Sequence, residues 1–355
     1  MPSFEGGGVE KNIIMIINNF IKKDVNISLI TASKKIRKKI NKKVDLINPK
    51  YNFWNYQPRF IKYTLCIFFL YLEYCNNKNF HVFCFQGNFI CIFFCKIFRL
   101  KIIIRPNSSP IGWSKNFIKK FLFSKILGLA DIIVVNSLLF KKEFKDIFKL
   151  DTKCIYNPLN IHEIMRLSKK KINFKFFKKN YLNIISLGRL VEQKDHITAI
   201  KAVEMLKEKL NLRLLIIGEG NEKNYLYNYI KKKDLNDTIK IKNRLENPFP
   251  YLLKAEIMLL TSKYEGLPNV LLEALALKKF IISTNCPTGP KEILDNGKGG
   301  LLFKVGDYSE LSKKIIFYSK QKKKMYEKKK FAISRLDRFN YQQNIDKYFN
   351  LFKYL

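Results

Sequence analysis

The residues best suited to chemistry lie in the segment 262–274, which reads SKYEGLPNVLLEA. It follows the apolar run 257–260, and its Pro268 suits the first position of a helix, where no backbone N–H is needed. Doubly wound α/β folds bind ligands at such strand–loop–helix junctions, and the free N–H groups of the helix attract phosphate. Glu273 stands among valine, leucine and alanine, where a buried carboxylate requires a polar partner. That partner is either a ribose diol or an ordinary salt bridge.

A second strand-to-helix junction carries two basic residues. Gly188 ends an apolar run, Arg189 follows it, and Lys194 stands just before a helical pattern. Arginine can hold phosphate oxygens through two parallel hydrogen bonds, and lysine adds a point charge beside them. The pair is therefore either a diphosphate clamp or two of the many surface charges of a basic chain.

Three glycines near the N-terminus, Gly6, Gly7 and Gly8, stand directly before a helical pattern. A backbone without Cβ atoms lets a ligand approach closely. These glycines form either a ligand-binding turn or a flexible chain end.

Metal, dinucleotide and nucleophile sites are not indicated. The segment 218–220 lacks the third glycine of the dinucleotide fingerprint, and no Asp-x-Asp pair offers carboxylates to a metal at a sugar nucleotide. We interpret His81 and His196 as structural and His162 as exposed, because none has the neighbours of a nucleophile–base pair. The sequence therefore predicts no metal and no cofactor.

These residues must be positioned by strands and helices that alternate along the chain. Apolar, β-branched runs predict strands at 25–30, 44–47, 81–85, 101–104, 132–135, 153–156, 182–187, 212–217, 239–242, 256–260 and 280–283. Helical patterns fall between them, at 9–23, 59–74, 89–98, 114–128, 137–148, 197–209, 222–232 and 268–277. Apolar strands separated by helices indicate parallel sheets covered on both faces, so we predict an α/β fold of two doubly wound, Rossmann-like domains.

The two domains are predicted to join within the lysine-rich stretch 160–180, after the turn Asn157-Pro158. We assign residues 1–165 to the first domain and 166–340 to the second. The amphipathic pattern 341–355 follows the last expected strand and predicts a closing helix.

The composition is that of a globular chain with an unusual charge. The 355 residues include 67 Lys and Arg and 29 Asp and Glu, a formal net charge of +38. This charge is spread along the chain, so it is either compositional or directed at an acidic partner, and an anionic membrane surface fits better than DNA. The apolar stretches 61–74 and 80–98 are short or interrupted by polar residues, which argues against membrane spans. Seven cysteines and the lack of a secretory signal indicate a cytoplasmic protein with free thiols.

Taken together, these segments resemble the family 4 glycosyltransferases over nearly the whole chain. The most specific part is the spacing of Glu265 and Glu273, which is similar to the Glu-x7-Glu motif of that family. The supporting segments, in family order, are Gly6–Glu10, Tyr156–Pro158, Gly188–Leu190 with Lys194, and Gly300–Phe303 before Gly306 and Asp307. The resemblance implies the GT-B architecture of two facing Rossmann-like domains, with the helix at 341–355 packed back on the first domain.

The resemblance also implies roles for individual residues. Arg189 and Lys194 would bind the donor diphosphate, Glu273 the ribose hydroxyls, and Glu265 would face the transferred sugar. The further donor-binding residues would be Gly188, Gly266, Leu267, Pro268 and Asn269, with Gly7 and Gly8 closing over the donor from the first domain.

The implied reaction retains the anomeric configuration, without a metal, by front-face attack with the departing phosphate as base. A UDP-hexose or UDP-N-acetylhexosamine would be the donor. The segments Arg105–Ser109 and Asn285–Glu292 look like those of members that build bacterial surface polysaccharides. Those members commonly use a lipid-linked glycan acceptor at the inner face of the cytoplasmic membrane.

Two departures from the family concern the first domain. Many relatives have a His or Asp near the reacting sugar, whereas this chain has Asn107, Ser108 and Ser109, so we name no general base. A strand usually precedes the glycine loop, and only Met1–Phe4 stand before Glu5 here. We therefore expect the first strand to be missing through a misplaced start site or a truncation.

Two other functions remain open from the sequence. A non-catalytic, membrane-associated protein could retain the same fold. A basic nucleic-acid-binding protein would instead require clustered basic patches with interleaved aromatic residues.

Overall fold

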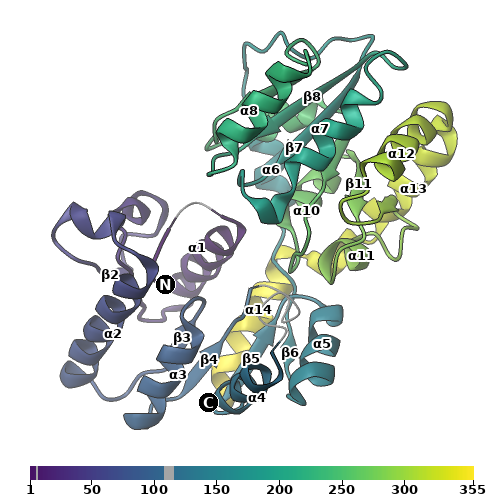
Figure 1. The fold of residues 1–355 in the computed structure, drawn as a ribbon. Coiled ribbons are helices and arrows are strands. Elements are labelled where there is room, and N and C mark those ends of the chain that lie inside the picture. The colour runs from purple at the N-terminus through teal and green to yellow at the C-terminus, as the bar shows by residue number, and fades with distance from the viewer. Residues whose placement is uncertain (5–6, 108–115) are drawn as a thin grey trace. The chain divides into compact units, whose positions relative to one another are not determined.

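The computed structural model describes residues 1–4, 7–107 and 116–355, which form two compact units (Figure 1). The first unit is Met1–Pro158 with Tyr341–Leu355, and the second is Leu159–Asn340. The second unit thus begins seven residues before the boundary that the sequence placed at 166. The reason is the helix α6 (Ile161–Ser168), which packs against α9 (Phe249–Lys254) and α10 (Asn269–Ala276) of the second unit.

The second unit is built on one parallel sheet. Its strand order is β12-β11-β10-β7-β8-β9, and all neighbouring strands run in parallel. The strands are β7 (Leu182–Leu187), β8 (Leu212–Ile217), β9 (Ile239–Lys242), β10 (Ile257–Leu260), β11 (Phe280–Thr284) and β12 (Leu301–Phe303). The remaining helices of this unit are α7 (His196–Glu204), α8 (Lys223–Lys232), α11 (Gly289–Ile293), α12 (Tyr308–Lys320) and α13 (Lys322–Ser334).

The direction in which this sheet grows reverses between β7 and β10. From β7 the chain adds β8 and β9 on one side, and then returns to add β10, β11 and β12 on the other. Such a switch point leaves a crevice at the carboxyl ends of the two central strands, where doubly wound folds bind ligands. Every residue of β7 and β10 is buried, because helices cover both faces of the sheet.

The first unit contains a two-stranded and a four-stranded parallel sheet, of order β1-β2 and β3-β4-β5-β6. The strands are β1 (Ser28–Ile30), β2 (Asp45–Ile47), β3 (Val82–Cys84), β4 (Ile102–Ile104), β5 (Ile132–Val135) and β6 (Lys153–Cys154). The helices are α1 (Gly8–Phe20), α2 (Arg59–Asn76), α3 (Asn88–Ile97), α4 (Phe117–Leu127), α5 (Leu138–Phe148) and α14 (Tyr341–Leu351). Met1–Phe4 belong to no strand, but the Met1 amino group donates to Ile30 O at 2.8 Å and Ala32 N donates to Pro2 O at 3.1 Å.

The closing helix α14 packs on the first unit, as predicted. It contacts α1, and its Tyr348 is fully buried. The Tyr348 hydroxyl accepts a hydrogen bond of 2.8 Å from Nε of Arg105, a fully buried arginine that follows β4. The same guanidinium donates to the amide oxygens of Asn157, at 2.6 Å, and Asn107. A buried charge needs such partners, and here they join the helix to the ends of the strands.

Candidate functional site

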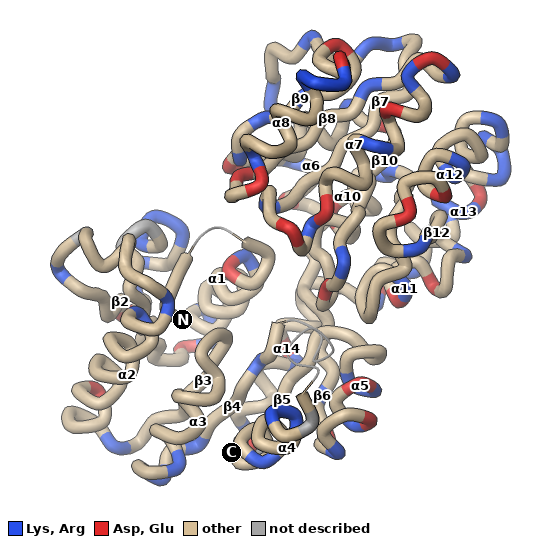
Figure 2. Tube along the Cα trace, viewed as in Figure 1, with Lys and Arg blue, Asp and Glu red and all other residues tan. Residues whose placement is uncertain are grey.

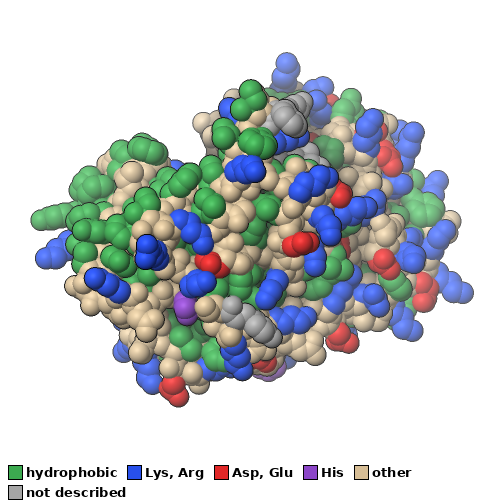
Figure 3. All heavy atoms as spheres, turned by 90° about the horizontal axis from the view of Figure 1, so that it is seen from below, with side chains coloured by type: hydrophobic (Ala, Val, Ile, Leu, Met, Phe, Trp, Pro, Cys, Tyr) green, Lys and Arg blue, Asp and Glu red, His purple; other side chains and the backbone are tan. Residues whose placement is uncertain are grey.

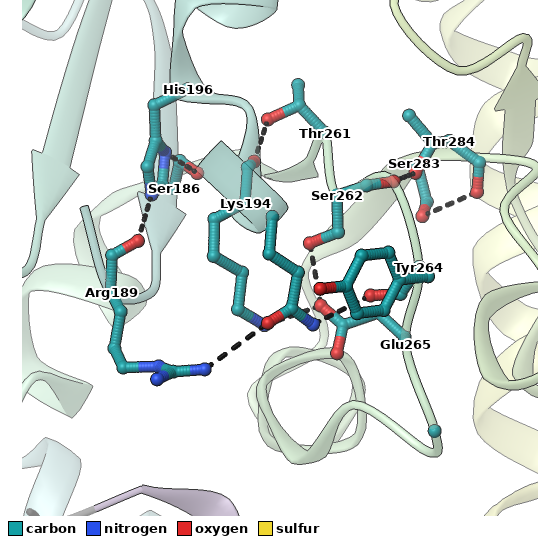
Figure 4. Close-up of polar contacts among 12 residues, drawn as sticks. Ser186, Arg189, Lys194, His196, Thr261, Ser262, Tyr264, Glu265, Ser283 and Thr284 are labelled. Atoms are coloured by element: carbon teal, nitrogen blue, oxygen red, sulfur yellow. Dashed lines mark hydrogen bonds and ion pairs between the residues drawn. The ribbon is translucent and has the colours of Figure 1, made fainter. Parts of the chain in front are cut away.

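The two junctions that the sequence singled out lie next to each other in the second unit. One follows β7 and the other follows β10, and these strands are hydrogen-bonded neighbours at the switch point. Parallel neighbours end at the same edge of a sheet, so both loops leave from that edge. Figure 4 shows the side chains of the two loops converging there.

Lys194 and Glu265 form an ion pair across the two loops. Lys194 Nζ lies 2.5 Å from Glu265 Oε1, although the residues are 71 positions apart in sequence. The same carboxylate oxygen accepts a hydrogen bond of 2.6 Å from the Ser262 hydroxyl. The side chains are only 16% and 9% exposed, so each charge depends on the other for compensation. The structure therefore places the predicted diphosphate-binding lysine on the predicted sugar-facing carboxylate.

Arg189 is exposed and lies beside this pair. Its Nη2 donates to Gln193 Oε1 at 3.2 Å. Gln193 also joins the loops, because its Nε2 donates to Tyr264 O at 2.9 Å and its carbonyl accepts from Lys263 N at 2.8 Å. Sequence reasoning missed this role of Gln193, since its partners follow a different strand.

His196 contacts the backbone of the loop that carries Arg189. It is buried, with Nε2 at 3.2 Å from Arg189 O and Nδ1 at 3.3 Å from Ser186 Oγ. A carbonyl oxygen can only accept, so Nε2 carries the proton and Nδ1 accepts from the hydroxyl. Removal from water lowers the pKa of His196 to about 4, which keeps the ring neutral at pH 7. This contact network supports the interpretation of His196 as structural.

We expect the stability of the protein to fall between pH 7 and pH 5 in a way that depends on His196. In the unfolded chain this histidine binds a proton at a pKa near 6.5, whereas in the folded chain it does so only near 4. The unfolded state therefore binds more protons in this window, and the free energy of unfolding decreases by about 2 kcal/mol as pH falls to 5. Urea denaturation at both values should show a smaller decrease for His196→Gln. An equal decrease in both proteins would contradict the buried, neutral ring.

The loop from Gly266 to Asn269 is anchored to the segment after β11. The Thr288 hydroxyl donates to Glu265 O at 2.7 Å and to Gly266 O at 3.1 Å, and Gly289 N donates to Gly266 O at 2.8 Å. These bonds fix the backbone that leads into α10, whose N-cap is Pro268. The helix begins at Asn269, so Leu267 and Pro268 precede its first turn.

Glu273 lies in the second turn of α10 and is 6% exposed, as its apolar neighbours indicated. Both carboxylates of the Glu-x7-Glu motif are thus buried, one before the helix and one within it.

Two glycines after β8 let its loop approach the Arg189 loop. A Cβ on Gly218 would lie 1.8 Å from Gly188 O, and one on Gly220 would lie 2.1 Å from Leu190 O. The glycines at 218 and 220 therefore allow close packing between neighbouring loops.

The predicted residues of the first unit are described only in part. Gly7 caps α1 in an extended conformation, Gly8 is its first residue, and a Cβ on Gly7 would meet nothing within 4 Å. Gly6, Ser108 and Ser109 lie outside the described residues. In the described ranges, no group of three or more His, Cys, Asp and Glu side chains is arranged to hold a metal ion.

Comparisons with known proteins bear on the whole chain. Residues 168–353 match the family model "Glycosyl transferases group 1". An uncharacterised glycosyltransferase of Methanocaldococcus jannaschii is 35% identical over 219 residues, which are 56% of this chain and 52% of that protein, so the chain spans about half the length of that relative. The N-acetylgalactosamine-N,N'-diacetylbacillosaminyl-diphospho-undecaprenol 4-alpha-N-acetylgalactosaminyltransferase of Campylobacter jejuni is 29% identical over 68% of this chain and 69% of its own length.

A solved structure shares the fold. The crystal structure of Anabaena HepE in complex with UDP superposes with a TM-score of 0.77 over 100% of this chain and 98% of that chain, at 15% identity. The fold is thus GT-B, as the resemblance implied. Because the family model covers 186 of the 355 residues, the chain belongs to the group 1 glycosyl transferases.

Proposed function

We propose that the protein transfers a hexose or N-acetylhexosamine from a UDP-sugar to a lipid-linked or surface-polysaccharide glycan, with retention of configuration. The observation that carries this proposal is the convergence of Arg189, Lys194 and Glu265 at the carboxyl ends of β7 and β10. Positive charge and a carboxylate at a switch point suit a substrate with both a diphosphate and a sugar.

At the carboxyl ends of β7 and β10, the donor diphosphate would bind Arg189 in place of its present partner, Gln193. Arg189 is exposed, and its partner among the described residues is the neutral amide of Gln193, so its fork of N–H groups can turn to phosphate oxygens. Lys194 would be shared between the diphosphate and Glu265. The N-terminus of α10 adds backbone N–H groups and a partial positive charge, which supports an anion beside Leu267 and Asn269. Anabaena HepE, which has the same fold, was crystallised with UDP.

The two carboxylates would hold the hydroxyl groups of the donor. Glu265 accepts from Ser262 and Lys194 through one oxygen, Oε1, so hydroxyls of the transferred sugar could bind its other oxygen, Oε2. Glu273, on α10, would bind the ribose.

In this mechanism the protein stabilises the leaving group rather than forming a covalent bond. Arg189 and Lys194 would offset the charge that develops on the departing UDP, and each such contact contributes about 10²–10³-fold to the rate. The departing phosphate would take the proton of the acceptor hydroxyl on the same face of the sugar. No metal and no cofactor takes part in this proposal.

The acceptor class is proposed from the relatives. The name of the Campylobacter protein specifies a diphospho-undecaprenol-linked glycan. We propose an acceptor of this kind, a lipid-linked glycan presented at the inner face of the cytoplasmic membrane, and therefore a cytoplasmic protein that works at that surface.

The test is UDP release from a panel of UDP-hexoses and UDP-N-acetylhexosamines, with and without a polyprenyl-diphosphate-linked glycan. We expect at least one donor to be turned over faster with the acceptor, with no effect of EDTA and with the α configuration kept in an NMR spectrum of the product. Arg189→Ala should lower the rate about 100-fold. Arg335→Ala, at an exposed arginine at the end of α13, is the matched control and should behave as wild type.

Equal rates for wild type and Arg189→Ala would contradict the proposed site. UDP binding without turnover of any donor would favour the non-catalytic alternative.

A further inference from the structure

The helix α2 is apolar but hardly buried. Its sequence is RFIKYTLCIFFLYLEYCN, and among these eighteen residues only Leu70 is buried. Large side chains point to solvent instead, with Phe60 69%, Phe68 54% and Tyr71 43% exposed. An apolar helix of a globular domain normally buries its apolar side chains in the core. The outer face of α2 instead exposes large apolar side chains to solvent.

The neighbouring helices continue this exposed apolar surface. α2 packs on the end of α3, where the rings of Tyr74 and the C-cap residue Phe98 are 4.7 Å apart. α3 packs on α4 through Phe89 and Phe123, whose rings stack at 4.8 Å. The three helices therefore form one layer. The exposed large side chains of this layer are Phe60, Ile61, Phe68, Tyr71, Leu72, Phe93, Ile97, Ile118, Phe121 and Leu122, and we call their surface the α2–α4 face.

Two further aromatic residues extend this surface ahead of α2. Phe53 and Tyr56 belong to the short 3-10 helix Asn52–Tyr56 and are 51% and 86% exposed. Figure 3 shows hydrophobic side chains gathered at the left of the view, where α2 lies in Figure 1, with Lys and Arg among them.

The part of the chain that contains the α2–α4 face carries almost only positive charges. Between Tyr51 and Ala130 the sequence holds eleven Lys and Arg residues and a single acidic residue, Glu73, a net charge of +10. Of these eleven, Arg105 is buried, and Lys96 and Lys101 pair with Asp131, which follows this range. Arg59, Lys119 and Lys125 are exposed among the apolar side chains, and Lys125 Nζ lies 5.4 Å from the centre of the Phe121 ring. Figure 2 shows Lys and Arg positions distributed along the second unit as well, so charge alone does not distinguish the face. The α2–α4 face differs from the rest of the surface because it combines cations with exposed aromatic and aliphatic groups.

This mixture identifies the partner. A second copy of the chain would bring another net charge of +38 against the face, which repulsion opposes. Nucleic acid offers phosphates but no apolar layer for Phe68, Ile97 and Leu122. An anionic bilayer offers both, since phosphates attract Lys and Arg while aromatic and aliphatic groups enter the boundary between headgroups and acyl chains. No helix in the described part of the chain is long and apolar enough to cross a bilayer.

We propose that the α2–α4 face docks the protein on the surface of an anionic lipid bilayer, with α2 lying in the plane of the interface. Docking of this kind does not depend on the proposed sugar transfer, although it would bring the protein to a lipid-linked acceptor.

The test is co-sedimentation with vesicles of phosphatidylcholine mixed with phosphatidylglycerol, compared with vesicles of phosphatidylcholine alone. We expect the wild type to bind the mixed vesicles at least about tenfold more tightly, because apolar insertion and phosphate contacts act together. Two double variants should each weaken this binding about tenfold: Phe68→Ser with Ile97→Ser, and Lys119→Glu with Lys125→Glu. The residues are exposed, so thermal melts should stay at the wild-type temperature.

Matched controls come from the second unit. Phe317→Ser with Tyr326→Ser removes exposed apolar groups there, and Lys323→Glu with Lys330→Glu reverses two exposed charges. Both should bind vesicles as wild type does. UDP release in the absence of lipid should be unchanged in the face variants, which separates failure of docking from failure of the proposed enzyme.

Three outcomes would overturn the proposal. The first is wild-type protein that binds neither vesicle or both equally. The second is face variants that bind as tightly as their controls. The third is a concentration-dependent dimer, seen by sedimentation, that only the face variants abolish, which would assign the face to a second copy.

Discussion

A Lys194→Met variant should transfer sugar about 10²–10³-fold more slowly than wild type and should also unfold at a lower urea concentration. The rate falls because the departing diphosphate loses one of its two proposed cations. The stability falls for a different reason. Glu265 is 9% exposed at its side chain, and Lys194 at 2.5 Å is its compensating charge. The variant therefore leaves a buried carboxylate that still accepts a hydrogen bond from the neutral Ser262 hydroxyl but has lost its ion-pair partner.

The two effects can be separated with a second substitution. Breaking a buried pair by removing one partner costs about 3–5 kcal/mol, whereas replacing both partners with neutral groups is often close to neutral. Lys194→Met combined with Glu265→Gln should therefore recover most of the free energy of unfolding and none of the activity. Urea denaturation and UDP release, measured on all three variants with Glu265→Gln alone, complete the cycle. Recovery of activity in the double variant would show that the lysine acts only by balancing the glutamate.

A Gly218→Ala variant is expected to lose about 100-fold in turnover without touching a predicted contact to the substrate. The added Cβ would lie 1.8 Å from Gly188 O, a backbone atom that cannot turn aside. The loop carrying Arg189 must then move, and a displacement of about 1 Å at a catalytic group costs roughly that factor. Overpacking should also lower the free energy of unfolding by about 1–3 kcal/mol.

Gly299→Ala provides a matched steric control. Its Cβ would lie 2.7 Å from Ala332 Cβ, on α13 and outside the two loops that carry the predicted site. We expect a comparable loss of stability but a wild-type rate per folded molecule, with the folded fraction taken from circular dichroism. A similar loss of rate in both variants would mean that the second unit as a whole, rather than the position of the Arg189 loop, controls turnover.

Local sequence pattern was a good guide to the second unit and a weaker one to its periphery. The strands from β7 to β11 lie where the sequence predicted them. The central strands β7 and β10 are largely apolar because both of their faces are buried, whereas β9, at the edge of the sheet, alternates isoleucine with lysine. The helices α12 and α13 were not assigned. α13 carries many lysines and little apolar periodicity, so tertiary packing rather than composition defines it. In α12 the buried residues Leu311, Ile315 and Tyr318 do recur at helical spacing, and that pattern was overlooked.

The sequence pattern also did not predict which apolar side chains remain exposed. The pattern at 59–74 predicted a helix, and α2 is one, but a run with so few polar residues does not tell which side remains uncovered. That surface became visible only once α3 and α4 were placed beside it.

The amino-acid sequence by itself determined the α/β class, the two strand-to-helix junctions, and the burial of Glu273, because each depends on neighbours within a few residues. The tertiary structure alone decided that Lys194 pairs with Glu265 and that Gln193 joins the two loops. It also decided that His196 is buried against the Arg189 backbone, which keeps its ring neutral. These contacts arise between segments far apart in the chain. Their formation depends on the order of strands in the sheet, which places β7 beside β10, and local propensity carries no information about that order.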